Sequence, residues 1–175
     1  MEKHRKYALA AALCALAALA VIYAFALRQA KKEREEESPG MLMDLTADRI
    51  AGIRITDASG EVRASFVREN GAWREEGAAA APDQTAVNKL AASLTGVRLI
   101  EVIGDVADPG EYGLAAPRGT IEITDTDGQA ARILIGDENE MTVSLYCALN
   151  GDTGTVYAVS ASLTAETGPY LNGAS

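Results

Sequence analysis

The sequence contains very few of the residues on which nucleophilic and zinc chemistry depend. Among its 175 residues there is one histidine, His4, and there are two cysteines, Cys14 and Cys147. Because His4 lies near the amino end, the rest of the chain has no histidine for a Ser-His or Cys-His catalytic pair. A zinc site would lack its usual imidazole and thiolate ligands. No glycine-rich loop of the phosphate-binding kind is present either.

Aromatic residues are scarce as well, at 5% of the chain. The only aromatic residues after position 37 are Trp73, Phe66 and four of the six tyrosines. These are too few for an evident sugar-binding platform. Carboxylates are abundant, but they stand beside Gly and Asn in turn-like segments, where water reaches them. A carboxylate-dependent hydrolase, which needs one acid held protonated in an apolar setting, is therefore the least favoured alternative. We assign no catalytic residue and no cofactor.

Cations are few in the body of the chain. Residues 1–37 carry 7 Lys and Arg against 5 Asp and Glu, whereas residues 38–175 carry 9 against 20, a net charge of −11. Nucleic acid is bound through clustered cations, so this composition excludes it as a partner. The same charge disfavours direct binding of the body to anionic lipid.

An uncharged run over residues 7–27, YALAAALCALAALAVIYAFAL, predicts a transmembrane helix in contact with membrane lipid. Twenty-one helical residues span roughly 31 Å, which matches a hydrocarbon core of about 30 Å. A cleaved secretory signal is the alternative, because Lys3, Arg5 and Lys6 precede the run. The apolar core of such signals is shorter, about 7–15 residues, which favours the uncleaved helix.

This assignment divides the chain into four parts. They are a short cytoplasmic tail (1–6), the membrane helix (7–27), a charged linker (28–41) and an extracytoplasmic domain (42–175). The basic residues on the two sides of the helix nearly balance, but the short tail and the glutamates of the linker favour a cytoplasmic amino end. The predicted location is the cell membrane, crossed once.

Alternating apolar and polar residues predict a three-stranded antiparallel meander over residues 53–76. Its first two strands cover 53–57 and 61–69. Asn70-Gly71 is a strong hairpin signal, because both residues accept positive φ, and it leads to a third strand that bears Trp73.

A helix is predicted from Gln84 to Thr95, with Asp83 as its N-cap and Gly96 as its stop. Its apolar residues recur at helical spacing: Val87, Leu90, Ala91 and Leu94. A helix this short and polar on its other face must pack against a sheet to be stable.

The remaining segments predict further strands, which complete an α+β domain. They cover 97–103, 120–124, 131–135, 143–149 and 155–159, with one helical turn around Glu111 and a last short helix before Gly168-Pro169. Cys147 alternates with apolar neighbours and is expected to be a buried strand residue, unpaired with Cys14. The fold class is therefore α+β, with antiparallel meanders and hairpins packed against one main amphipathic helix.

Two hairpins repeat the motif I-x-I-T-D-x-x-G, at IRITDASG (53–60) and IEITDTDG (121–128). The second copy places Asp125 and Asp127 two apart before a glycine, as calcium loops begin. Counted as an EF-hand loop, the glycine comes one residue late and position 12 is Gly136. We therefore predict no metal site. If one existed, Asp125 and Asp127 would be its weak candidate ligands. In the hairpin interpretation, Asp bonds its own backbone and Gly takes positive φ.

Tyr112 and Arg118 flank an irregular, turn-rich stretch and are the candidates for a partner surface, because exposed aromatic and arginine side chains often mark one. The alternative is structural: a tyrosine of this kind more often packs its ring and bonds a nearby carbonyl.

The segment EYGLAAPRGTIEITDTDGQAARILIGD (111–137) resembles the domain of unknown function 4340 family of bacterial membrane-anchored proteins. NGAWR (70–74), AVNKLAASLTGVR (86–98) and YCALNGDTGTVYAVS (146–160) agree, so the resemblance covers roughly residues 42–165. It implies an N-terminal membrane helix and an extracytoplasmic α+β domain, and it supplies no catalytic residues. Some relatives are linked to ABC-transport or gliding-type envelope machinery. Relatives often carry a second unit, so any function that needs two units would require two of these chains to associate.

The leading hypothesis is a single-pass membrane protein with a non-enzymatic domain that binds envelope or transporter-associated proteins, as a scaffold or accessory module. The alternative from another class is a small-ligand or weak calcium-binding module that uses the acidic turns.

Overall fold

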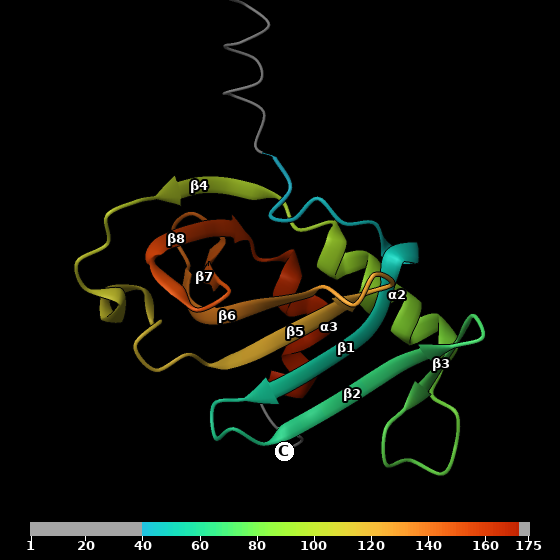
Figure 1. Cartoon of the computed structure of the whole chain (residues 1–175). Helices are drawn as coiled ribbons and strands as arrows, with labels where there is room; N and C mark the ends of the chain where they lie inside the picture. Colours follow the sequence, from blue (N-terminus) through green and yellow to red (C-terminus); the bar gives the residue numbers. More distant parts are fainter. Residues whose placement is uncertain (1–39, 172–175) are drawn as a thin grey trace, which may run out of the picture. The chain divides into compact units, whose positions relative to one another are not determined.

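The computed structural model describes residues 40–171, which form one antiparallel sheet and two helices (Figure 1). The chain divides into two units, Met1–Pro39 and Gly40–Ser175. The predicted tail (1–6), the predicted transmembrane helix (7–27) and nearly all of the linker (28–41) lie outside the described residues.

The elements lie close to their predicted positions. The strands are β1 (Ile50–Asp57), β2 (Val62–Glu69), β3 (Ala72–Glu75), β4 (Leu99–Ile103), β5 (Gly119–Asp125), β6 (Ala130–Asn139), β7 (Ser144–Leu149) and β8 (Asp152–Ser160). The helices are α2 (Gln84–Thr95) and α3 (Ser162–Leu171), and two 3₁₀ turns are η1 (Ala47–Arg49) and η2 (Pro109–Tyr112). The predicted α+β class is confirmed.

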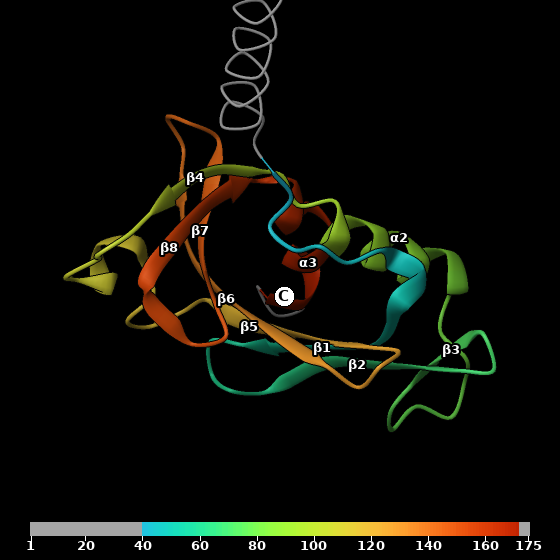
Figure 2. The same ribbon diagram turned by 45° about the horizontal axis from the view of Figure 1, so that its top comes forward.

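One sheet holds all eight strands in the order β3-β2-β1-β5-β6-β7-β8-β4. Every neighbouring pair is antiparallel. The sheet curls around the helices, so that α2 and α3 lie on its inner side (Figure 2). After α2 the chain runs to the edge opposite β3, where β4 pairs with β8.

Helix α2 begins and ends as its sequence predicts. The Asp83 carboxylate accepts hydrogen bonds from the N–H groups of Thr85 (2.8 Å) and Ala86 (3.3 Å), which satisfies donors that a helix start leaves unpaired. Thr95 is the last helical residue, and Gly96 follows it with φ −89°. The helix therefore ends at the glycine without using the left-handed conformation that glycine permits.

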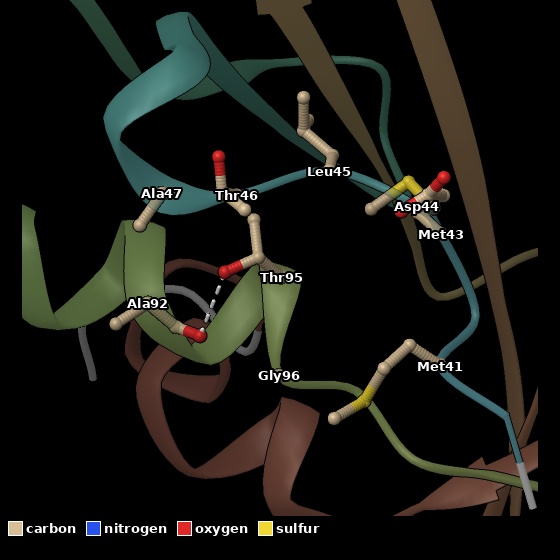
Figure 3. Close-up of a pocket in the computed structure, with 9 residues that line it drawn as sticks. All are labelled: Met41, Met43, Asp44, Leu45, Thr46, Ala47, Ala92, Thr95 and Gly96. Carbon is tan, nitrogen blue, oxygen red and sulfur yellow. Dashed lines mark hydrogen bonds between the residues drawn. The ribbon is translucent and has the colours of Figure 1, made fainter.

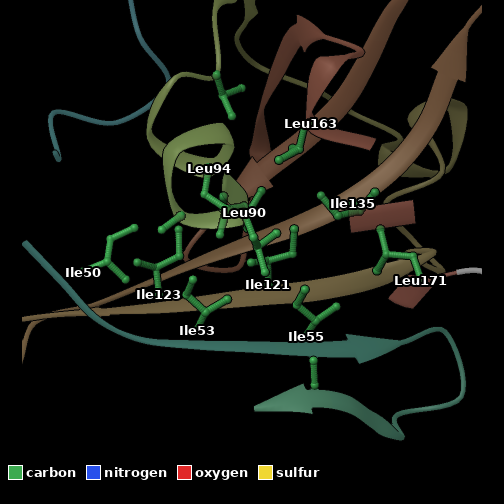
Figure 4. Close-up of a cluster of buried hydrophobic side chains, with 14 of the residues drawn as sticks. Ile50, Ile53, Ile55, Leu90, Leu94, Ile121, Ile123, Ile135, Leu163 and Leu171 are labelled. Atoms are coloured by element: carbon green, nitrogen blue, oxygen red, sulfur yellow. The ribbon is translucent and has the colours of Figure 1, made fainter. Parts of the chain in front are cut away.

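The core lies between the inner side of the sheet and the two helices (Figure 4). Its central strands contribute Ile50, Ile53, Ile55, Ile121, Ile123, Ile133 and Ile135, and its helices contribute Leu90, Leu94, Leu163 and Leu171. Ile53 stands opposite Ile123, and Ile55 opposite Ile121. The two copies of the repeated motif are thus neighbouring strands at the centre of the sheet. Each fully buried side chain of this size contributes about 1.5–3 kcal/mol.

The hairpin between β6 and β7 differs from its prediction. Residues 136–141 were expected to be a link, yet β6 continues to Asn139 through a register shift between Ile135 and Glu138. Val143, expected in the next strand, instead stands in the turn with φ +51° and 70% exposure. The alternation of apolar residues did not show that one extra residue bulges from β6 and shifts the start of β7.

The last helix is longer than predicted. Gly168-Pro169 was expected to follow it, but α3 continues to Leu171 with Pro169 inside. Proline removes one backbone hydrogen bond there, and tertiary packing compensates. Leu171 is buried in the core, and the Tyr170 ring meets Phe66 edge to face at 6.4 Å. The domain therefore has a second core helix beside α2.

Candidate functional site

Asp125 organises the turn between β5 and β6. Its Oδ1 accepts hydrogen bonds from the N–H groups of Asp127 (2.9 Å) and Gln129 (2.8 Å), and Gly128 has φ +78°. The predicted hairpin role, in which the Asp bonds its own backbone and the Gly takes positive φ, is confirmed.

The remaining carboxylate oxygens of this turn face a cation of the protein. Arg49 at the end of η1 places Nη2 3.2 Å from Asp125 Oδ2 and 2.5 Å from Asp127 Oδ2. Within residues 40–171, no group of three or more His, Cys, Asp or Glu side chains is arranged to hold a metal ion. The arginine thus supplies a positive charge where a metal ion would otherwise have to pair with Asp125 and Asp127.

Tyr112 is the last residue of η2, and its ring packs against β7. Its ring meets that of Tyr146 edge to face, with centroids 5.0 Å apart. A Cβ added at Gly136 would collide with the Tyr112 carbonyl oxygen, and one added at Gly113 would lie 2.5 Å from the Asp137 side chain. The E-Y-G-L (111–114) and L-I-G-D (134–137) motifs therefore pack against each other through two glycines. Ring packing, the structural alternative for Tyr112, is what the structure shows.

Arg118 lies beside the same bulge of β6. Its backbone N–H donates to the Ile135 carbonyl at 2.7 Å, and its guanidinium pairs with Glu138 at 3.0 Å. The structure thus brings Tyr112 and Arg118 together along residues 135–138 of β6. Whether they bind a partner stays a prediction.

Cys147 is fully buried in β7, as its alternation with apolar neighbours predicted. Burial raises the pKa of its thiol to about 12. The thiolate, which is the reactive form, is therefore negligible at neutral pH, and Cys147 acts as a small core residue.

A groove that sequence reasoning missed lies between α2 and the segment that precedes β1 (Figure 3). It has a volume of about 560 Å³ and is lined by Met41, Met43, Asp44, Leu45, Thr46, Ala47, Ala92, Thr95 and Gly96. Met41 is 59% exposed. The Met-Leu-Met run at 41–43 was the available signal, because methionine is frequent at adaptable binding surfaces.

The groove has a fixed wall and an adaptable one. The fixed wall is the last turn of α2, where Thr95 Oγ1 donates to the carbonyls of Ala91 and Ala92 at 3.2 Å. The other wall is the segment 41–47, in which Leu42 N–H donates to Val97 O at 2.9 Å and Met43, Leu45 and Ala47 are only partly buried against the core. Its unbranched methionine side chains can take several conformations at low energetic cost.

Comparisons with known proteins identify a family and nothing closer. Neither α2 nor α3, the helices of the described part, has the length and apolar character of a membrane-crossing segment. No curated protein and no solved structure matches the chain significantly. The sequence model of a domain of unknown function, DUF4340, matches residues 73–168, more than half of the chain. That span runs from the Trp73 strand through the E-Y-G-L and L-I-G-D motifs into α3, and the chain belongs to the DUF4340 family.

Proposed function

We propose that this chain is a single-pass membrane protein whose extracytoplasmic domain is a non-enzymatic docking module for proteins of a cell-envelope or transport-related complex. Residues 7–27 hold it in the lipid, and the domain presents the methionine-lined groove to a partner. The observation that carries the proposal is the position of this groove. Its first lining residue, Met41, follows directly on Gly40, where the domain begins.

The chemistry of the groove suits a protein ligand. Most of its lining is apolar, and Asp44, Thr46 and Thr95 supply its polar groups, a mixture of apolar and polar residues that also occurs in protein interfaces. Methionine fits partners of irregular shape. The carboxylates of the β5–β6 turn, Asp125 and Asp127, are already engaged by backbone N–H groups and by Arg49, which supports binding over hydrolysis.

Photo-crosslinking in native membranes tests this function. The full chain would carry a photoreactive amino acid at Met41 or, as a control, at the more exposed Met141 on the β6–β7 hairpin. We expect one envelope or transporter-associated protein to be captured from position 41 and not from 141. Capture of lipid and self alone would overturn the proposal.

A matched pair of variants separates the groove from the rest of α2. Ala92→Arg places a charged side chain in the groove, whereas Ala86→Arg places it on an exposed position of the same helix outside the groove. We expect Ala92→Arg to abolish capture and Ala86→Arg to leave it unchanged, with equal melting temperatures. Equal capture by both variants would remove the groove as the docking site.

A further inference from the structure

The two edge strands of the sheet, β3 and β4, differ in how far their outer backbone groups are already hydrogen-bonded. The edge strand β3 is closed by a side chain: the Gln84 amide accepts from Trp73 N–H at 2.7 Å and donates to Trp73 O at 2.9 Å. Those are the bonds that a further strand would make. β3 is also short and carries Arg74 and Glu75. Such features are how natural proteins prevent an edge strand from pairing with another chain.

The opposite edge strand, β4, has no such closure over most of its length (Figures 1 and 2). At its start Leu99 N–H donates to Gly40 O at 2.8 Å. From Ile100 to Ile103, no other element of the described chain pairs with its outer side. Ile100 and Val102 are 48% and 52% exposed. An edge with free backbone groups and exposed β-branched side chains is a template for strand addition.

The charges around β4 specify the partner. Between residues 98 and 111 there are four carboxylates, Glu101, Asp105, Asp108 and Glu111, and one cation, Arg98. Three of these carboxylates line a pocket of about 220 Å³ that begins at Ile103, the last residue of β4. Among residues 40–171 none of the three forms a salt bridge. The net charge of −11 over residues 38–175 extends the same preference to the whole domain.

We propose that β4 is a second docking site, at which an extended, basic segment of a partner protein adds as a ninth strand. Its backbone pairs with Ile100–Ile103, its apolar side chains cover Ile100 and Val102, and a Lys or Arg side chain reaches the pocket of Asp105, Asp108 and Glu111. Main-chain pairing supplies the affinity and the side chains supply the selectivity. Like-charge repulsion between two acidic domains disfavours a second copy of this chain as the occupant. The proposal adds a site to the docking function and rests on that function.

A defined peptide tests the proposal on the full chain held in phosphatidylcholine nanodiscs, which carry no net lipid charge. The probe is a fluorescent eight-residue peptide of alternating Val and Lys, and its anisotropy reports binding. We expect saturable binding that is lost with a Val-Glu peptide. We also expect no binding of a Val-Lys peptide that is N-methylated at every residue, which keeps the charge and lacks the backbone donors. Equal binding of the N-methylated peptide would overturn strand addition.

Variants locate the site. Ile100→Lys combined with Val102→Lys should weaken binding roughly tenfold or more, because it places cations where a basic strand must lie. Val62→Lys, at a residue of the same 48% exposure on β2, is the control and should leave the affinity within about twofold. Asp105→Asn with Glu111→Gln should weaken binding and reduce its salt dependence. Equal affinities for the β4 and β2 variants would overturn the proposal.

Two further outcomes would assign the edge to another occupant and so overturn the proposal. One is a dimer in sedimentation that Ile100→Lys with Val102→Lys dissociates. The other is peptide affinity that rises when residues 33–38 are replaced by Gly and Ser, since the linker would then have covered the edge. Failure of the peptide with successful capture from Met41 leaves the groove function intact, so the two failures are distinguishable.

Discussion

The turns at Asp57 and Asp125 have the same internal chemistry but different connections to the rest of the domain. In the first, Asp57 Oδ1 accepts from the N–H groups of Ser59 (2.8 Å) and Glu61 (3.1 Å), the pattern already described for Asp125. Asp57 Oδ2 pairs with Arg63 at 2.6 Å, within its own hairpin. Asp125 Oδ2 pairs instead with Arg49, which lies before β1.

This difference gives the second turn a wider role. Arg49 closes η1, whose first residue, Ala47, lines the methionine groove. The Arg49 carbonyl also accepts from Thr126 N–H at 2.8 Å, so backbone and side chain both tie η1 to the Asp125 turn. The repeated motif thus makes a self-contained hairpin once, and once a hairpin that holds one wall of the groove. Similar sequences therefore mark a shared turn rather than a shared function.

Removing Asp125 should have the largest effect. Asp125→Ala leaves two turn N–H groups without their acceptor and removes one of the two carboxylates that pair with Arg49, which predicts a loss of about 2–3 kcal/mol in the free energy of unfolding. Urea titration of the domain measures it. Asp125→Asn keeps the accepting oxygen and should recover most of the loss. The same loss in both variants would show that the charge, rather than the Asx bonds, stabilises the turn.

Replacing the glycine of either turn by alanine should destabilise the domain by a similar amount. Gly60 and Gly128 have φ +85° and +78°, and a Cβ added at either would meet no atom within 4 Å. Gly60→Ala and Gly128→Ala should therefore each lose about 1–2 kcal/mol, all of it from the left-handed backbone. Thermal melts compare them, with Asn replacements as milder controls. A clearly larger loss at Gly128 would mean that the wider connections of the second turn also constrain its backbone.

Low pH should reduce the free energy of unfolding through protonation of Asp57, and Asp57→Asn should remove this contribution. The Ser59 hydroxyl and the Arg63 guanidinium hold the pKa of the Asp57 carboxyl well below its usual range. The unfolded chain, with a pKa near 3.9 for Asp, therefore binds the proton more readily than the folded domain does. The stabilisation is complete above that pH and is lost as pH falls below it.

The measurement is the urea midpoint between pH 7 and pH 3. The wild type should lose more of its midpoint than Asp57→Asn does. Hydrogen bonds from Thr46 and Ser65 also lower the pKa values of Asp48 and Glu76, respectively. The urea midpoint of the variant should therefore still fall with pH, but less steeply. Identical slopes would remove Asp57 from the acid response.

Local signals in the sequence predicted more than long-range ones. The Asp83 cap and the Asn70-Gly71 turn are encoded within a few residues, and both stand where expected. Strand pairing is different, because alternation specifies which face of a strand is buried and not which strand lies beside it. The β1–β5 and β4–β8 pairings were therefore not predicted. The open edge depends on the β4–β8 pairing, and the groove depends on how residues 41–47 pack against α2, so the sequence predicted neither of them.

The smallest effect is expected where the two turns differ in sequence. Asp127→Ser gives the second turn the residue of the first, since Ser59 occupies the matching position. Asp127 is exposed, and surface ion pairs of this kind contribute about 0–1 kcal/mol, so the melting temperature should hardly change. Millimolar Ca²⁺ should leave both melting temperatures unchanged, because Arg49 already pairs with the carboxylates of the turn. A rise with Ca²⁺ in the wild type that Asp127→Ser abolishes would contradict this and make the turn a calcium site.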